Sequence, residues 1–127
     1  DNTIFRKLLT VPEYKDRYLT IYGEIYRKLT TDTMMEVLEE LVALIEPEME
    51  RHWTRWGPEN DRDIISEAPR TAEGAYKYWQ KRVERLRNVI RKRPTRLWDF
   101  TKKAFGLSNA EMEKYFGPKP PMPPEAI

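Results

Sequence analysis

The sequence predicts an all-α protein, with five or six helices in an irregular bundle and a Pro-rich C-terminal tail. Apolar residues recur at steps of three and four along several long segments, and helix-capping signals precede these segments. No segment of useful length shows the alternating pattern of a β-strand. The 127 residues suffice for one domain with its own core, which we place at residues 1–117, with residues 118–127 as a Pro-rich linker or tail.

The first predicted helix covers about residues 11–29. Thr10 and Glu13 have the spacing of a capping box, and Pro12 suits the first turn because it has no N–H to leave unpaired. One face of this helix is apolar and consists of Val11, Tyr14, Tyr18, Tyr22, Ile25 and Leu29.

The second predicted helix begins at Thr31 or Thr33, either of which can cap it, and Glu36 completes a capping box with Thr33. Pro47 interrupts the hydrogen-bond ladder, so we expect a kink or a fresh start there. The helix continues to Trp56 and stops at residues 57–58, after which residues 58–70 read as a loop. Its expected buried stripe consists of Met34, Leu38, Leu41 and Ile45.

The third predicted helix covers about residues 71–92, and Pro94 is expected to break it and to open a fourth helix that ends at Gly106. Ser108 and Glu111 form a capping box for a last short helix that closes at Gly117. The tail that follows has the composition of a polyproline-type linker. The large residues expected to fill the core include the four tryptophans, Trp53, Trp56, Trp79 and Trp98.

Charge is strongly segregated although the formal net charge is only +2. Residues 31–50 contain seven acids and no Lys or Arg, whereas residues 77–103 contain eleven cations and two acids, a net charge of +9. We expect the acidic and the basic helix to face each other or to solvate the surface. Trp79 falls on the apolar stripe and not among the cations, so the sequence does not favour nucleic-acid binding.

The sequence offers few groups for catalysis or metal binding. The chain has no cysteine, which excludes disulfide scaffolds, thiolate zinc sites and cysteine nucleophiles, and His52 is its only histidine. The five glycines are isolated, so no phosphate-binding Gly-rich loop is present. The mean hydropathy of −0.81 and the lack of a long apolar stretch argue against a membrane span. We therefore expect neither a metal site nor a membrane partner.

The most unusual segment lies at residues 48–57. On a helix, Arg51 and Arg55 share a face, as do His52 and Trp56, and Glu48 lies one turn before Arg51. A guanidinium held by a carboxylate and packed on indole is an oriented donor that can bind a phosphate or carboxylate. The alternative is an ion-paired, aromatic-stacked helix end that ties the helix to its neighbours. Whether Arg51, His52 and Arg55 touch a ligand stays open.

An ordered set of motifs resembles the C-terminal helical part of the CotH kinase family, the spore coat protein H-like atypical protein kinases. The motifs are the segment NTIFRKLLTVPEYKDRY at residues 2–18, the block I-E-P-E-M-x-R-H-x-x-R-W at residues 45–56, residues 79–94, and residues 105–107. The block is the most specific of them. The resemblance implies a structural or site-supporting role for the block residues Glu48, Arg51, His52, Arg55 and Trp56.

The family's activity, as the resemblance implies it, is ATP-dependent phosphorylation of Ser or Thr in secreted, surface or spore coat proteins. The groups that hold ATP and Mg²⁺ lie upstream of the matching segment in the family, so no catalytic residue and no cofactor are assigned to this chain. Because the chain opens on Asp1 and not on Met, we expect a piece of a longer protein. Because this piece lacks the family's nucleotide cradle, we expect it to be inactive alone. Its expected partners are the upstream kinase lobe and the parent's protein substrate; the alternative is a free-standing helical module for protein–protein interaction.

Overall fold

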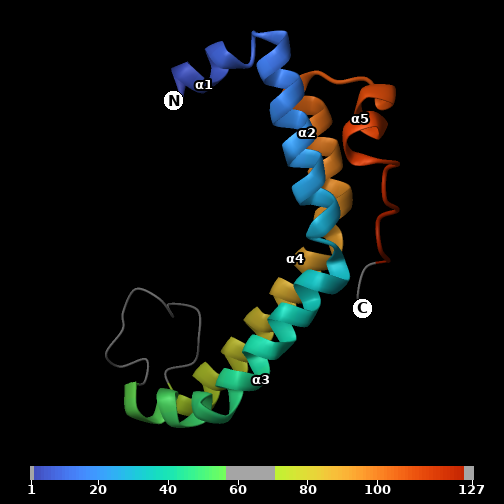
Figure 1. Ribbon diagram of the computed structural model, residues 1–127. Coiled ribbons are helices and arrows are strands. Elements are labelled where there is room, and N and C mark those ends of the chain that lie inside the picture. The colour runs from blue at the N-terminus through green and yellow to red at the C-terminus, as the bar shows by residue number, and fades with distance from the viewer. Residues whose placement is uncertain (1, 57–70, 125–127) are drawn as a thin grey trace. The chain divides into compact units, whose positions relative to one another are not determined.

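The computed structural model describes residues 2–56 and 71–124, and this part of the chain is all-α with five helices (Figure 1). The predicted fold class is therefore confirmed. The helices are α1 (Thr3–Leu8), α2 (Pro12–Lys28), α3 (Thr31–Trp56), α4 (Ala72–Phe105) and α5 (Asn109–Phe116). The loop predicted at residues 58–70 lies outside the described residues.

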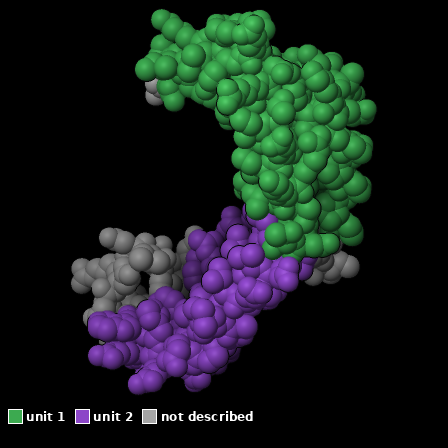
Figure 2. Space-filling model, in the orientation of Figure 1, with its two compact units in different colours: residues 1–33, 92–125, 127 green, residues 34–91, 126 purple. Residues whose placement is uncertain are grey.

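The described residues group into two compact units (Figure 2). The first unit holds residues 2–33 and 92–124, and the second holds residues 34–56 and 71–91. The core of the first unit is built from α2, α4, α5 and the connection between α4 and α5, and it consists of Leu19, Trp98, Leu107, Met112 and Phe116. Tyrosine and phenylalanine rings surround this core, as when Phe116 contacts Tyr22 edge to face at 5.2 Å between centroids.

Helices α3 and α4 lie side by side in the second unit and run antiparallel (Figure 1). Val42 of α3 and Ala75 and Ile90 of α4 are the buried apolar residues of this pair. Tyr76 lies beside Glu46 at one end, and Arg87 lies beside Glu39 farther along.

The starts of the helices differ in part from the sequence prediction. The Thr10 hydroxyl does not cap α2 but donates to the carbonyl of Lys7, because Thr10 closes the turn that follows α1. Thr31 and Thr33 lie inside α3, and the Thr30 hydroxyl accepts the N–H of Thr33. Helix α1, which was not predicted, begins after Asn2, whose side chain accepts the N–H of Phe5.

The prolines inside helices do not end them. Helix α3 passes through Pro47 without a fresh start, and its green end departs from the direction of the teal part (Figure 1). The predicted break at Pro94 is wrong, since α4 is continuous from Ala72 to Phe105. The carbonyl of Pro94 accepts a hydrogen bond from Tyr26 of α2, and Thr95 and Trp98 just beyond it are buried. Packing of this segment therefore outweighs the local cost of an interior proline.

The end of the chain agrees better with the prediction. Both hydrogen bonds of the Ser108–Glu111 capping box are present at the start of α5. Gly106 and Gly117 follow α4 and α5 with positive φ, the conformation that favours glycine. The described tail lies against α4, where the Trp98 indole donates to Gly117 and the Thr95 hydroxyl donates to Pro121. Whether residues 118–127 act as a linker stays a prediction.

Candidate functional site

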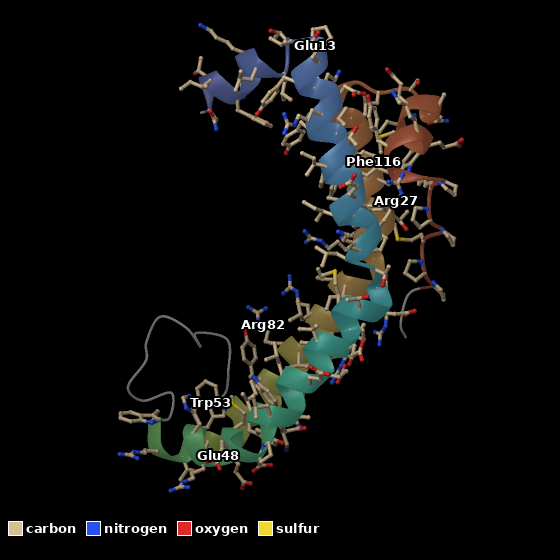
Figure 3. The ribbon with its side chains drawn as sticks, in the orientation of Figure 1. Glu13, Arg27, Glu48, Trp53, Arg82 and Phe116 are labelled. Carbon is tan, nitrogen blue, oxygen red and sulfur yellow. The ribbon has the colours of Figure 1, made fainter. Side chains whose placement is uncertain are left out.

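The block singled out in the sequence forms the last turns of α3. Glu48 and Trp53 are labelled there in Figure 3. The Arg51 Nη1 atom lies 3.9 Å from Glu48 Oε2, so the predicted pair exists, but the two side chains are 82% and 72% exposed. Such an exposed pair contributes little to stability. The Arg51 side chain therefore lies on the surface and does not form a buried ion pair.

The aromatic residues of the block also lie near the surface. The Arg55 guanidinium stacks over Trp56 at 5.1 Å from the ring centroid, and the His52 and Trp53 rings meet edge to face at 5.0 Å. Trp56 is 56% exposed, so the expectation that it fills the core is wrong. Helices α3 and α4 run antiparallel, and Tyr76 near the start of α4 lies beside Glu46. The last residues of α3, up to Trp56, therefore lie beyond the start of α4.

The side chains of the block lie at the surface of α3, where Arg51, His52, Arg55 and Trp56 are exposed. Arg51 and Arg55 are one turn apart on an open helix surface, and both can donate several hydrogen bonds to an anion or to a carboxylate of a partner. Trp53 is half-buried, and its indole N–H has no hydrogen-bond partner in the described part of the chain. Residues 2–56 and 71–124 hold no group of three or more acidic or histidine side chains arranged to bind a metal. The site-supporting role of the block stays a prediction.

Two aromatic residues of α4 stack on each other, and one of them contacts α3 near the start of the block. The Tyr76 and Trp79 rings stack at 5.9 Å with an interplanar angle of 17°, and the Tyr76 hydroxyl donates to Glu46 at 3.4 Å. Desolvation, and then the Glu46 carboxylate, raise the pKa of Tyr76. Trp79 is half-buried, which agrees with its predicted place on the apolar stripe. The contact between Tyr76 and Glu46 was not predicted from the sequence, because it joins two helices.

The acidic and basic helices face each other, as expected. Arg87 of α4 donates to both carboxylate oxygens of Glu39 of α3, at 2.6 and 2.8 Å, and to Glu84 at 3.1 Å. Arg91 adds a bond of 3.4 Å to Glu84. These hydrogen bonds lower the pKa of Glu39 and of Glu84 and raise that of Arg87. Arg82 of α4, labelled in Figure 3, is exposed, and its guanidinium lies over the Tyr78 ring at 5.3 Å from the centroid.

A second polar cluster joins α2 to α5 in the first unit. The Tyr115 hydroxyl donates to Asp16 at 2.5 Å, and Lys114 lies 3.5 Å from the same carboxylate oxygen. The bond from Tyr115 is the main cause that lowers the pKa of Asp16, and the same bond raises the pKa of Tyr115. Gly23 lies beneath this cluster, against the Tyr115 backbone. This cluster was not predicted, because no local sequence pattern indicates that α2 packs against α5.

Comparison with known proteins identifies a family. The family model described as CotH kinase protein matches residues 1–97, which include the whole block at the end of α3. No curated protein and no solved structure matches the chain. Among the described residues, no helix is both long enough and apolar enough to cross a membrane. Because the family model covers more than half of the sequence, the chain belongs to the CotH kinase protein family.

Proposed function

We propose that this chain is a helical subdomain of a CotH-like protein kinase and that it supports the catalytic lobe of the parent. The parent would transfer the γ-phosphoryl group of ATP to Ser or Thr of secreted, surface or spore coat proteins. The observation that carries the proposal is the exposure of the block at the end of α3, within the residues that match the family.

The exposure of the block indicates an interface, because the block contains residue types that contribute most to binding between proteins. Tryptophan and arginine are enriched among the residues that dominate binding between proteins. An exposed Trp56 with Arg55 stacked on it presents apolar area and charge together. A helix end that served only its own fold would bury the indole ring. We therefore place the contact with the catalytic lobe at Arg51, Arg55 and Trp56.

The chemistry assigned to the parent explains why a helical support is useful. Phosphoryl transfer depends mainly on positioning and charge neutralisation by cations, Mg²⁺ and the acidic residues that hold the metal. In this proposal those groups belong to the upstream lobe, which also holds ATP. This chain contributes a rigid surface that keeps the lobe in its active arrangement, and it has no kinase activity alone. Its location would be that of the substrates, outside the cell or in the spore coat.

The test separates a contact role from a folding role. Trp56→Ala and Arg51→Ala should leave the thermal midpoint of the isolated chain almost unchanged, because both side chains are exposed. The same substitutions should lower phosphorylation by the parent kinase severalfold. Lys81→Ala, an exposed cation of α4 outside the block, serves as the control and should change neither quantity. A large loss of stability in the isolated chain with Arg51→Ala would show that the block serves the fold.

A free-standing module for protein–protein interaction is the second candidate, and segregated charge favours it. Several acids of α3 and several cations of α4, among them Glu36, Glu40, Arg85 and Arg96, have no ion-pair partner among the described residues and are available to a partner. This candidate predicts a binding partner that is recognised without any upstream kinase lobe. Steeply salt-dependent binding to unrelated DNA would instead favour a nucleic-acid role.

A further inference from the structure

The first unit has an exposed apolar face on the side of α2 and α4 that lies away from α5. Ile21 and Ile25 are each two residues from Gly23, which α5 covers, so they point to the opposite side of α2. Phe100 is likewise two residues from Trp98, whose ring is buried against Gly117. Ile21, Ile25 and Leu29 are 47–53% exposed, and Phe100 is 66% exposed.

Cations border this apolar face. Arg96 lies one turn and Arg93 two turns before Phe100 on α4, and Arg17 lies one turn before Ile21 on α2. All three are exposed, and none has an ion-pair or hydrogen-bond partner in the described part of the chain. We call Ile21, Ile25, Leu29 and Phe100, with these three arginines, the basic face. The basic face is complementary in polarity and charge to an apolar helix surface that is bordered by carboxylates.

Helix α3 carries a ridge of that kind. Val37, Leu41 and Leu44 follow one another at helical spacing and are 52%, 53% and 73% exposed, so the expectation that Leu41 belongs to the buried stripe of α3 is wrong. Leu44 is two residues from both Val42 and Glu46, which face α4, so the ridge lies on the free side of α3.

Two carboxylates run along this ridge. Glu40 lies one turn before Leu44, and Glu36 lies one turn before Glu40. Both are exposed and without an ion-pair partner among the described residues, unlike Glu39, which binds Arg87. We call Val37, Leu41 and Leu44, with Glu36 and Glu40, the acidic face.

We propose that the basic face of one copy binds the acidic face of a second copy of this chain. The two faces match in character, since each is an apolar stripe and the charges on their borders are opposite. Helix-in-groove recognition uses the same spacing of apolar anchors along one side of a helix. The proposal goes beyond the supporting role of the block at the end of α3 and does not depend on it.

Use of both faces by both copies would make the association stronger. In a twofold dimer each contact occurs twice, so the buried area doubles without any new surface. A stable interface needs roughly 800 Å² from each partner. Each face has only three or four apolar side chains, so two such contacts bury an area closer to this value than one contact does. If the contacts do not close on each other, the same faces would form longer assemblies instead.

The test measures the mass of the full 127-residue chain by sedimentation over a wide range of concentration. We expect reversible association that weakens as salt screens the charged borders. Arg93→Glu with Arg96→Glu should raise the dissociation constant by about tenfold or more, because like charges then face each other across the contact. Glu36→Lys with Glu40→Lys should have the same effect. The chain with all four substitutions should associate nearly as well as the original.

The control reverses two other exposed cations of α4, Lys81→Glu with Arg82→Glu, and should leave the association unchanged. Circular dichroism checks that every variant keeps its helix content. A chain that stays monomeric at all concentrations would overturn the proposal, as would association that the charge reversals do not weaken or that the fourfold variant does not regain. Binding to vesicles of anionic phospholipid without self-association would also overturn it, since the basic face would then serve a lipid surface.

Discussion

Gly23 shows how one residue fixes the packing of the first unit. It lies in the middle of α2, where glycine weakens a helix, and its Cα side faces the Tyr115 backbone of α5. A Cβ atom at this position would overlap the carbonyl oxygen of Tyr115. The close approach also brings Tyr115 to Asp16. A lone glycine inside a helical pattern was the available signal for a close packing contact, but it did not indicate which element approaches.

Gly23→Ala is expected to lower the free energy of unfolding by about 2 kcal/mol or more, because a rigid backbone must move to admit the methyl group. Chemical denaturation followed by circular dichroism measures this loss. Glu24→Ala at the next, exposed position should change the stability by no more than about 0.5 kcal/mol. Equal effects of the two substitutions would show that α5 does not pack against Gly23.

At the scale of elements, local signals predicted the helices and contacts between helices decided their ends. The capping box of α5 uses only neighbouring residues, and it was predicted correctly. Pro94 was misread because the support for a continuous α4 comes from α2, whose Tyr26 donates to the Pro94 carbonyl. The short helix α1 was missed because its six residues carry no clear apolar period, although Asn2 was a capping signal.

Pro94→Ala is expected to raise the free energy of unfolding by about 1–3 kcal/mol, because alanine restores an N–H to the ladder of a helix that is continuous there. Thermal unfolding of the whole chain measures the gain. Pro12→Ala provides the matched control, since a proline in the first turn of α2 sacrifices no hydrogen bond and its replacement should have little effect. Loss of stability in Pro94→Ala would contradict a continuous α4.

The pairing of α3 with α4 should weaken in acid. Arg87 lowers the pKa of Glu39 and of Glu84 below the ordinary value of 4.5. A carboxyl group with a lowered pKa in the folded state stabilises the fold above its ordinary pKa, and this contribution disappears as the pH falls through the lowered value. We therefore expect the thermal midpoint to fall between about pH 5 and about pH 3.

Arg87→Met isolates the contribution of these two carboxyls, because Arg87 forms ion pairs with no other acid among the described residues. The variant should be less stable than the original near neutral pH, and its midpoint should fall less steeply in acid. If the thermal midpoints of the two proteins fell equally steeply in acid, the bonds from Arg87 would not stabilise the pairing of α3 and α4.

At the scale of the whole molecule, the sequence predicted the class of fold and the family but not the distribution of buried surface. The resemblance to the family was carried by short motifs of adjacent residues, which are local information, and the family model that matches residues 1–97 confirms it. The exposure of Trp56 was not predictable, because it depends on where α4 begins beside α3. The bonds from Arg87 to Glu39 followed the expected attraction of two charged helices, but their register required the structure.

The most direct test of the supporting role is reconstitution of the proposed parent kinase from two polypeptides. The upstream lobe is assayed for transfer of the γ-phosphoryl group of ATP to a protein substrate, with and without this chain. We expect no transfer by this chain alone, weak transfer by the lobe alone, and a severalfold increase when the chain is added but not when it carries Trp56→Ala. Transfer by the isolated chain, or full activity of the lobe without it, would contradict the account.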